Sequence, residues 1–190
     1  MTSPASVTGD ERLRLFLGLR LPEQVLDACE AWQRAYLGSV RVVPREHLHV
    51  TLAFLGHRPA DELDAIVDEL RAAAASAGPD LRLAVGRYRE TRSVAMLVLE
   101  DAGGGATTLA EDVQARLEAL GVYRREGRPW LPHLTVARFR ARPGLRLEPP
   151  RLGGPMGTFV PSDAAAYLSR LHPGGAQYAV LESIRLAPLR

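Results

Sequence analysis

The stretch that decides the fold is HVTLAF at residues 49–54, because it returns as HLTVAR at residues 133–138. A proline precedes each copy, Pro44 in the first case and Pro132 in the second, and each copy follows a segment that predicts a helix. Short runs that alternate apolar residues with β-branched ones are typical of strands. We therefore expect two equivalent strands, 84 residues apart, in a fold with an internal repeat.

Side chains of a strand point alternately to its two faces. This alternation places His49 and Thr51 on one face of the first strand, and His133 and Thr135 on one face of the second, with a small alanine following each pair. Two such strands facing each other would line a cleft with two imidazoles and two hydroxyls. The opposite, buried faces would be filled by Leu48, Val50, Leu52, Phe54, Leu134 and Val136.

The rest of the chain alternates between helical and extended patterns. Several predicted strands are joined by short turns, which favours a mixed, mainly antiparallel α+β fold over a parallel doubly wound sheet. The glycines at 103–105 lack the spacing of a dinucleotide-binding fingerprint. The patterns predict strands at 12–21, 48–55, 81–88, 94–100, 131–140, 158–171 and 177–186, helices at 22–37, 60–77 and 108–120, a linker at 102–105, a loop at 143–157 and a turn at 172–175.

Size and composition indicate one globular unit. A chain of 190 residues, 46% of them hydrophobic, suits one large domain or two small lobes that share a core. No apolar run is long enough for a membrane helix, and the first dozen residues lack the pattern of a signal peptide. We therefore expect a cytoplasmic monomer in which residues 1–11 form a flexible N-terminus.

All 24 basic residues are arginine. Without lysine the chain cannot form the lysine adduct of an ATP-dependent ligase, the phosphate-binding loop of an NTPase or a pyridoxal Schiff base. Guanidinium groups suit phosphate oxygens, although such a cluster is more often a solvated surface. The arginines concentrate in one stretch, at Arg124, Arg125, Arg128, Arg138, Arg140 and Arg142.

Two imidazoles and two hydroxyls in one cleft suit in-line displacement at phosphorus. One neutral imidazole takes a proton from the attacking water, and the other, protonated, gives a proton to the departing oxygen. Thr51, Thr135 and Arg138 would hold the non-bridging oxygens. By strict alternation Arg138 points away from His133, so it needs a bulge or a twist to reach the phosphate. The histidines show no helical spacing typical of a metal site, so we expect no metal and no cofactor.

The paired motifs resemble those of the 2H phosphoesterase superfamily, and the surrounding sequence is similar to the RNA 2′,3′-cyclic phosphodiesterases, also called 2′-5′ RNA ligases. The resemblance spans nearly the whole chain in the family's order. It rests on RLF at residues 14–16, PREHLHVTLAFLG at 44–56, RPWLPHLTVAR at 128–138 and LSRLHPGGAQY at 168–178.

The resemblance implies a single bilobal domain with pseudo-twofold symmetry and an active site between the lobes. It implies hydrolysis of RNA 2′,3′-cyclic phosphate ends to 2′-phosphomonoesters, without metal or nucleotide cofactor. His133 would activate water and His49 would protonate the leaving 3′ oxygen, with Thr51 and Thr135 as phosphate ligands. Arg138 matches the family's arginine after the second motif. Phe16 matches an aromatic position that either stacks on a base or belongs to the core.

Three alternatives stay open at this point: ligation by the reverse reaction, which needs no ATP, an RNA-binding module without activity, and action on another cyclic phosphate ester. His47 would lie at the rim of the site or, with His49, bind a metal. Trp130 would stack on RNA or serve the fold. The remaining residues of note are expected to be exposed (His57 and His172) or buried in the core (Cys29 and Trp32).

Overall fold

A computed structural model describes residues 11–38, 40–78, 80–152, 157–173 and 175–186. The predicted flexible N-terminus lies almost entirely outside these residues, as do parts of the predicted loop at 143–157 and turn at 172–175. No helix in the described ranges is both long enough and apolar enough to cross a membrane.

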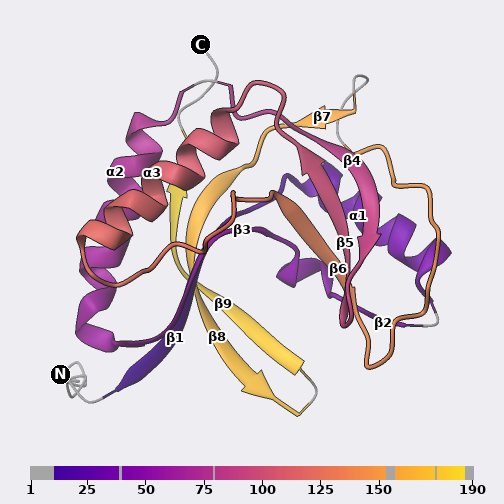
Figure 1. The fold of residues 1–190 in the computed structure, drawn as a ribbon, viewed down its shortest axis with the longest axis horizontal. Helices are drawn as coiled ribbons and strands as arrows, with labels where there is room; N and C mark the ends of the chain where they lie inside the picture. Colours follow the sequence, from indigo (N-terminus) through magenta and orange to yellow (C-terminus); the bar gives the residue numbers. More distant parts are fainter. Residues whose placement is uncertain (1–10, 39, 79, 153–156, 174, 187–190) are drawn as a thin grey trace, which may run out of the picture.

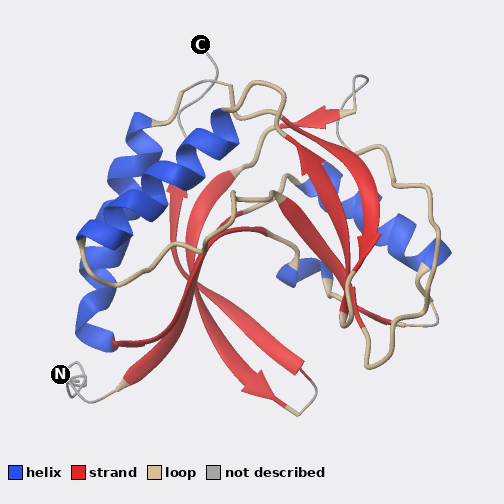
Figure 2. Cartoon of the chain, in the orientation of Figure 1, coloured by secondary structure: helices blue, strands red, loops and turns tan. Residues whose placement is uncertain are grey.

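The fold is α+β, as the patterns predicted, and the strand pairings described are antiparallel (Figures 1 and 2). The sheet has the order β7-β4-β5-β6-β3-β1-β8-β9, with β2 beside β6. Its strands are β1 (Arg12–Leu19), β2 (Arg41–Val42), β3 (Val50–Pro59), β4 (Leu83–Glu90), β5 (Val94–Glu100), β6 (His133–Arg138), β7 (Thr158–Phe159), β8 (Asp163–His172) and β9 (Gly175–Arg185). The helices are α1 (Glu23–Tyr36), α2 (Leu63–Ser76) and α3 (Gly105–Ala119), with 3₁₀ turns at Arg45–His47 and Ala60–Glu62.

The sheet consists of two halves that meet where the motif strands touch. β3 and β6 are joined through the residue pair Val50–Leu134. One half contains β3, β1, β8 and β9, and the other contains β6, β5, β4, β7 and β2. The halves diverge from this junction (Figure 1), which gives the predicted bilobal arrangement.

The helices are exchanged between the halves. Helix α1 follows β1 but packs beside β6, whereas α3 follows β5 but packs beside β3, next to α2 (Figure 1). Each half therefore buries its sheet under a helix whose preceding strand belongs to the other half. This exchange ties the two halves together around one core.

The core is built from the apolar faces of the strands and helices. Leu15, Leu17 and Leu19 of β1 are at most 1% exposed. Trp32 and Cys29 of α1 are buried, as predicted for core residues. Burial raises the pKa of the Cys29 thiol to about 12, so the thiol stays protonated and unreactive at neutral pH.

One predicted strand is in fact two separate strands. The stretch 158–171 forms two strands, β7 and β8, interrupted at Val160–Ser162, where Pro161 cannot donate a ladder hydrogen bond. β7 pairs with β4 in one half and β8 pairs with β1 in the other, so the chain crosses between halves at this point.

The other differences concern the ends of elements. β3 continues past Gly56, where it was predicted to stop, to Pro59, and α3 begins at Gly105, inside the predicted linker. The short strand β2 was not predicted, because two residues are too few to show a period. The remaining ends shift by a few residues, as is usual for fraying termini.

Candidate active site

Strand β3 carries a bulge in the middle of its motif. Opposite it on β1, Gly18 pairs with Thr51 and the preceding Leu17 pairs with Ala53, so Leu52 has no partner of its own. An extra residue of this kind interrupts the alternation of side chains along the strand.

Strand β6 has a bulge at the equivalent place. Opposite it on β5, Met96 pairs with Thr135 and the preceding Ala95 pairs with Ala137, which leaves Val136 as the extra residue. The internal repeat therefore extends to the irregularity of the backbone, and the two motif strands bend in the same way.

The bulges correct the predicted faces of both strands. Phe54 was expected in the core but is 47% exposed, while Ala53 and Ala137 were expected beside the histidines but are buried. Arg138, expected to need a bulge to reach the site, lines the pocket that contains His49. One extra residue before each alanine moves it to the buried face and turns the next side chain toward the site.

A glutamine from the exchanged helix stabilises each bulge. The carbonyl of the extra residue is buried and needs donors, and that of Val136 already accepts from the Val43 backbone N–H at 2.9 Å. Gln114 of α3 donates from Nε2 to the Leu52 carbonyl at 2.9 Å, and Gln33 of α1 donates to the Val136 carbonyl at 2.8 Å. Gln33, 2% exposed, also donates to the Val43 carbonyl at 2.9 Å.

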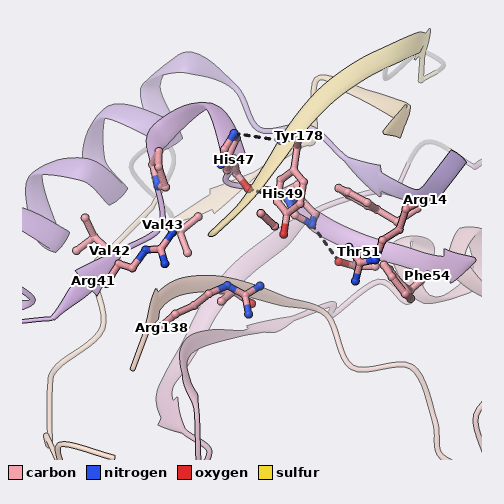
Figure 3. Close-up of a pocket in the computed structure, with 14 residues that line it drawn as sticks. Arg14, Arg41, Val42, Val43, His47, His49, Thr51, Phe54, Arg138 and Tyr178 are labelled. Atoms are coloured by element: carbon pink, nitrogen blue, oxygen red, sulfur yellow. Dashed lines mark hydrogen bonds between the residues drawn. The ribbon is translucent and has the colours of Figure 1, made fainter. Parts of the chain in front are cut away.

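Both histidines are oriented by the same hydrogen bond. Nδ1 of His49 lies 2.7 Å from the His47 carbonyl, and Nδ1 of His133 lies 2.8 Å from the Leu131 carbonyl. Because a carbonyl only accepts, Nδ1 carries the proton in each ring, and Nε2 is the atom that exchanges a proton in the site. Nε2 of His49 lies 3.1 Å from the Thr51 hydroxyl, which donates to it when the ring is neutral (Figure 3).

Aromatic rings surround His49. Phe16, Tyr178 and Tyr167 have ring centroids 4.7, 5.4 and 5.5 Å from the imidazole. Gly18 passes beneath the ring, where a Cβ would come within 3.3 Å of His49 Cδ2 and 3.1 Å of the Val50 carbonyl oxygen. A side chain at the position opposite Thr51 would therefore press against the His49 ring and the backbone of Val50.

This environment lowers the pKa of His49 to about 4. Burial is the largest cause, the hydrogen bond to the His47 backbone acts against it, and the positive charges of His133, Arg138 and His47 lower the pKa further. His49 is therefore neutral at pH 7 in the free protein. A bound phosphate anion would raise its pKa.

Phe16 of β1 packs against the His49 ring inside the half of the sheet that contains β3. It is 3% exposed and stacks on Tyr167 with a centroid distance of 4.6 Å and an interplanar angle of 4°. This packing favours the core alternative for Phe16 over a base-stacking platform. Phe54, by contrast, is 47% exposed and lines the site, and the guanidinium of Arg14 lies over its ring, 4.6 Å from the centroid.

Two adjoining pockets meet at the motif strands. The first, about 220 Å³, contains His49, and the second, about 300 Å³, contains His133. Thr51 and Phe54 line both, so they form the boundary between the two histidines. The polar and aromatic lining of the first pocket is Arg14, Phe16, Arg41, His47, His49, Thr51, Phe54, Thr135, Arg138 and Tyr178 (Figure 3).

The structure thus brings five of the six predicted site residues into one pocket and His133 into its neighbour. The sequence patterns missed Arg14, Arg41, Phe54 and Tyr178. Arg14 and Tyr178 lie in segments that carry the family resemblance, so that resemblance was the signal available for them. No sequence signal marked Arg41, because it lies in the two-residue strand β2.

The other residues singled out from the sequence have structural positions. His47 lies at the rim, where its Nε2 accepts a hydrogen bond from the Tyr178 backbone N–H at 3.3 Å. Trp130 donates from Nε1 to the Thr51 carbonyl at 2.9 Å, which anchors the segment before β6 to β3. His57 and His172 are exposed, as predicted. Among the described residues, no three His, Cys, Asp or Glu side chains are grouped so as to hold a metal ion.

Comparison with known proteins agrees with this geometry. Residues 21–152 match the family model described as the 2′-5′ RNA ligase superfamily. A Thermus thermophilus protein named RNA 2′,3′-cyclic phosphodiesterase is 34% identical over 186 residues, which cover 92% of this chain and 90% of the relative. One of the same name from Methanocaldococcus jannaschii is 23% identical, over 90% of this chain and 99% of the relative.

Solved structures share the fold. TT0787 of Thermus thermophilus superposes with a TM-score of 0.72 at 32% identity, over 94% of this chain and 100% of that one. E. coli LigT, in a complex with 3′-AMP, superposes with a TM-score of 0.74 at 23% identity, over 93% of this chain and 99% of that one. The match over most of the chain, together with the repeated motif, shows that the chain belongs to the 2′-5′ RNA ligase superfamily.

Proposed function

We propose that this protein hydrolyses RNA 2′,3′-cyclic phosphate ends to 2′-phosphomonoesters, with His49 and His133 as the acid–base pair. The observation that carries the proposal is the matched orientation of the two imidazoles. Each is fixed through Nδ1 by the carbonyl two residues before it, so each uses Nε2 for proton transfer. The names of the two relatives support the same reaction.

The reaction needs two proton transfers at opposite sides of one phosphorus atom. Water attacks the phosphorus and gives its proton to one imidazole, the bond from phosphorus to the 3′ oxygen breaks, and the other imidazole protonates that oxygen. The products are a 2′-phosphomonoester and a 3′ hydroxyl. Thr51 and Thr135 would donate to the non-bridging oxygens, and Arg138 would neutralise the charge that builds there.

The family resemblance gives His133 the role of base and His49 that of acid. The low pKa of His49 in the free protein makes this assignment depend on the substrate. The phosphate anion must first raise the pKa of His49, so that the ring binds a proton within the complex. The reverse assignment, with His49 as base, needs no such step.

A second activity, alcoholysis, is favoured by the pocket beside His133. Tyr123, Trp130, Arg89 and Arg128 line it, a set that suits the nucleoside of an RNA 5′ end. A 5′ hydroxyl placed there could replace water and form a 2′-5′ phosphodiester without ATP. Hydrolysis should dominate in dilute solution, because water is the more abundant nucleophile.

The test is release of a 2′-phosphomonoester from a short RNA that ends in a 2′,3′-cyclic phosphate, in the presence of EDTA. We expect turnover by the wild type and losses of about 10²–10⁴-fold in both His49→Ala and His133→Ala, the usual range for one general acid or base. His57→Ala, an exposed histidine outside both pockets, is the matched control and should retain activity. Wild-type protein without turnover, or full activity in either motif variant, would refute the proposal.

A further inference from the structure

Two arginines face each other across the pairing of β2 with β6. Arg41 and Arg138 are direct partners in this antiparallel pair, and both line the first pocket. Side chains that oppose each other directly lie on the same face, where like charges destabilise the pair. Neither arginine forms a salt bridge within the described part of the chain. Anions bound by the two guanidinium groups would relieve the repulsion.

The first pocket holds more positive charge than one phosphodiester requires. Arg14, Arg41 and Arg138 line it, and its described lining contains no carboxylate. The charge of Arg138 contributes to the low pKa of His49, which places this guanidinium near the reacting phosphorus. Arg41 lines the same pocket from β2, the strand beside Arg138.

The backbone on the far side of the cleft leaves room for Arg41. Its guanidinium lies against Gly175, at the start of β9, so closely that a Cβ there would overlap with it. Gly175 also has a φ of 116°, a value that favours glycine. In Figure 3, Arg41 lies on the opposite side of His49 from Arg14 and Phe54. Arg41 thus occupies one end of the pocket, beyond the catalytic groups.

We propose that Arg41 binds a second phosphate of the substrate, the one on the 5′ oxygen of the nucleoside whose 2′,3′-cyclic phosphate is opened. This inference rests on the proposed function. The 5′ oxygen and the cyclic phosphate lie at opposite ends of a ribose, as Arg41 and the catalytic groups do in the pocket. A guanidinium fork binds phosphate oxygens through charge-assisted hydrogen bonds. The preferred substrates are then RNA ends or 5′-phosphorylated nucleotides rather than 5′-hydroxyl nucleosides.

Two substrates that differ by one phosphate test this role. Adenosine 2′,3′-cyclic phosphate is compared with the same compound phosphorylated at the 5′ oxygen, for the wild type, Arg41→Gln and Arg87→Gln. We expect the wild type to favour the 5′-phosphorylated compound in kcat/KM by about tenfold, the effect of one partly solvated charge-assisted contact. Arg41→Gln should bring this ratio close to one. Arg87, an exposed arginine on β4 outside the pockets, serves as the control with the same change of charge.

The ratio separates this inference from its alternatives. A wild type that opens both compounds equally well refutes the role of Arg41 and leaves the proposed function intact. Equal losses for both compounds in Arg41→Gln also refute it, because they mean that Arg41 acts on the reacting phosphate or on the closure of the cleft. A wild type that opens neither compound, nor the RNA end, refutes the proposed function itself. Arg41→Lys, which keeps the charge, should retain part of the preference.

Discussion

The two motif strands share one backbone but lie in different surroundings. His49 and His133 take the same hydrogen bond at Nδ1, and both strands bulge after the threonine. Their neighbours differ, because β1 places Gly18 opposite Thr51 whereas β5 places Met96 opposite Thr135. The repeat therefore fixes the geometry of the site, and the adjacent strands determine the chemistry of each half.

The clearest difference comes directly after the bulges. The equivalent positions hold Phe54 in β3 and Arg138 in β6, and both side chains reach the first pocket. At this pair of positions, one half contributes an apolar ring and the other a cation. In the proposed function, this difference suits a nucleotide, which has a base at one end and a phosphate at the other.

The largest expected effect comes from removing this difference. Arg138→Gln should lower kcat by about 10²-fold, because in the proposed reaction this guanidinium neutralises the charge that develops on the phosphate oxygens. Phe54→Leu should leave kcat within a few-fold and raise KM, because stacking contributes to binding before and during the reaction alike. Steady-state kinetics on an RNA 2′,3′-cyclic phosphate end measures both.

Arg140→Gln is the matched control for Arg138→Gln, since Arg140 is an exposed arginine close by in the chain and outside the pockets. If Phe54→Leu lowered kcat as much as Arg138→Gln does, the two side chains would not have separate roles in binding the base and the phosphate. That result would contradict the proposed difference between the two halves.

The bulges also explain how far the sequence could go. The repeated histidine and threonine were sufficient to predict the strands, their shared face and the cleft. The same alternation then placed Phe54 in the core, because nothing in the letters HVTLAF marks Leu52 as an extra residue. At the bulge, the Leu52 carbonyl accepts a hydrogen bond from Gln114 of a distant helix, a tertiary interaction that no local pattern contains.

The contacts between residues on neighbouring strands could not be predicted from the sequence either. The approach of Arg41 to Arg138 depends on a two-residue strand, and the cage around His49 depends on Tyr167 and Tyr178 from the last hairpin. Here the order of strands in space decides the neighbours. The resemblance to a family supplied the order of motifs along the chain but not these contacts.

The aromatic cage gives a second way to test the comparison. In the free protein, NMR titration of the His49 ring should give a pKa near 4. Tyr178→Ala admits water to the ring and should raise this pKa toward 6.5, the unperturbed value. Arg138→Gln should also raise it, because a positive neighbour is removed. A His49 pKa that stays unchanged in Tyr178→Ala would show that the cage is not what distinguishes this histidine.

The dependence of the residual kcat/KM on pH in His133→Ala then assigns the role of His49, because this ratio reports the protonation states of the free protein and the other motif histidine no longer titrates. If His49 is the base, kcat/KM rises with pH up to about 4 and this group causes no loss above that value. If His49 is the acid, it must be protonated, and kcat/KM falls tenfold for each pH unit above about 4. The second result would match the assignment that the family resemblance implies.

The smallest effects concern the glutamines that hold the bulges. Gln33→Leu leaves the buried Val43 carbonyl without a side-chain donor and the Val136 carbonyl with only the Val43 backbone N–H, and should lower the free energy of unfolding by about 2 kcal/mol. Gln114→Leu removes one such bond, to Leu52, and should cost about 1 kcal/mol. Urea unfolding measures both.

The two variants should differ less in stability than in what they do to the site. Gln114 donates to the bulge before Phe54, and Gln33 donates to the bulge before Arg138. If the bulges set the directions of these two side chains, Gln33→Leu should lower kcat, as Arg138→Gln does. Gln114→Leu should raise KM, as Phe54→Leu does. Losses of stability without this split in the kinetics would mean that the strands keep their bulges unaided, and that the glutamines serve only to satisfy buried carbonyls.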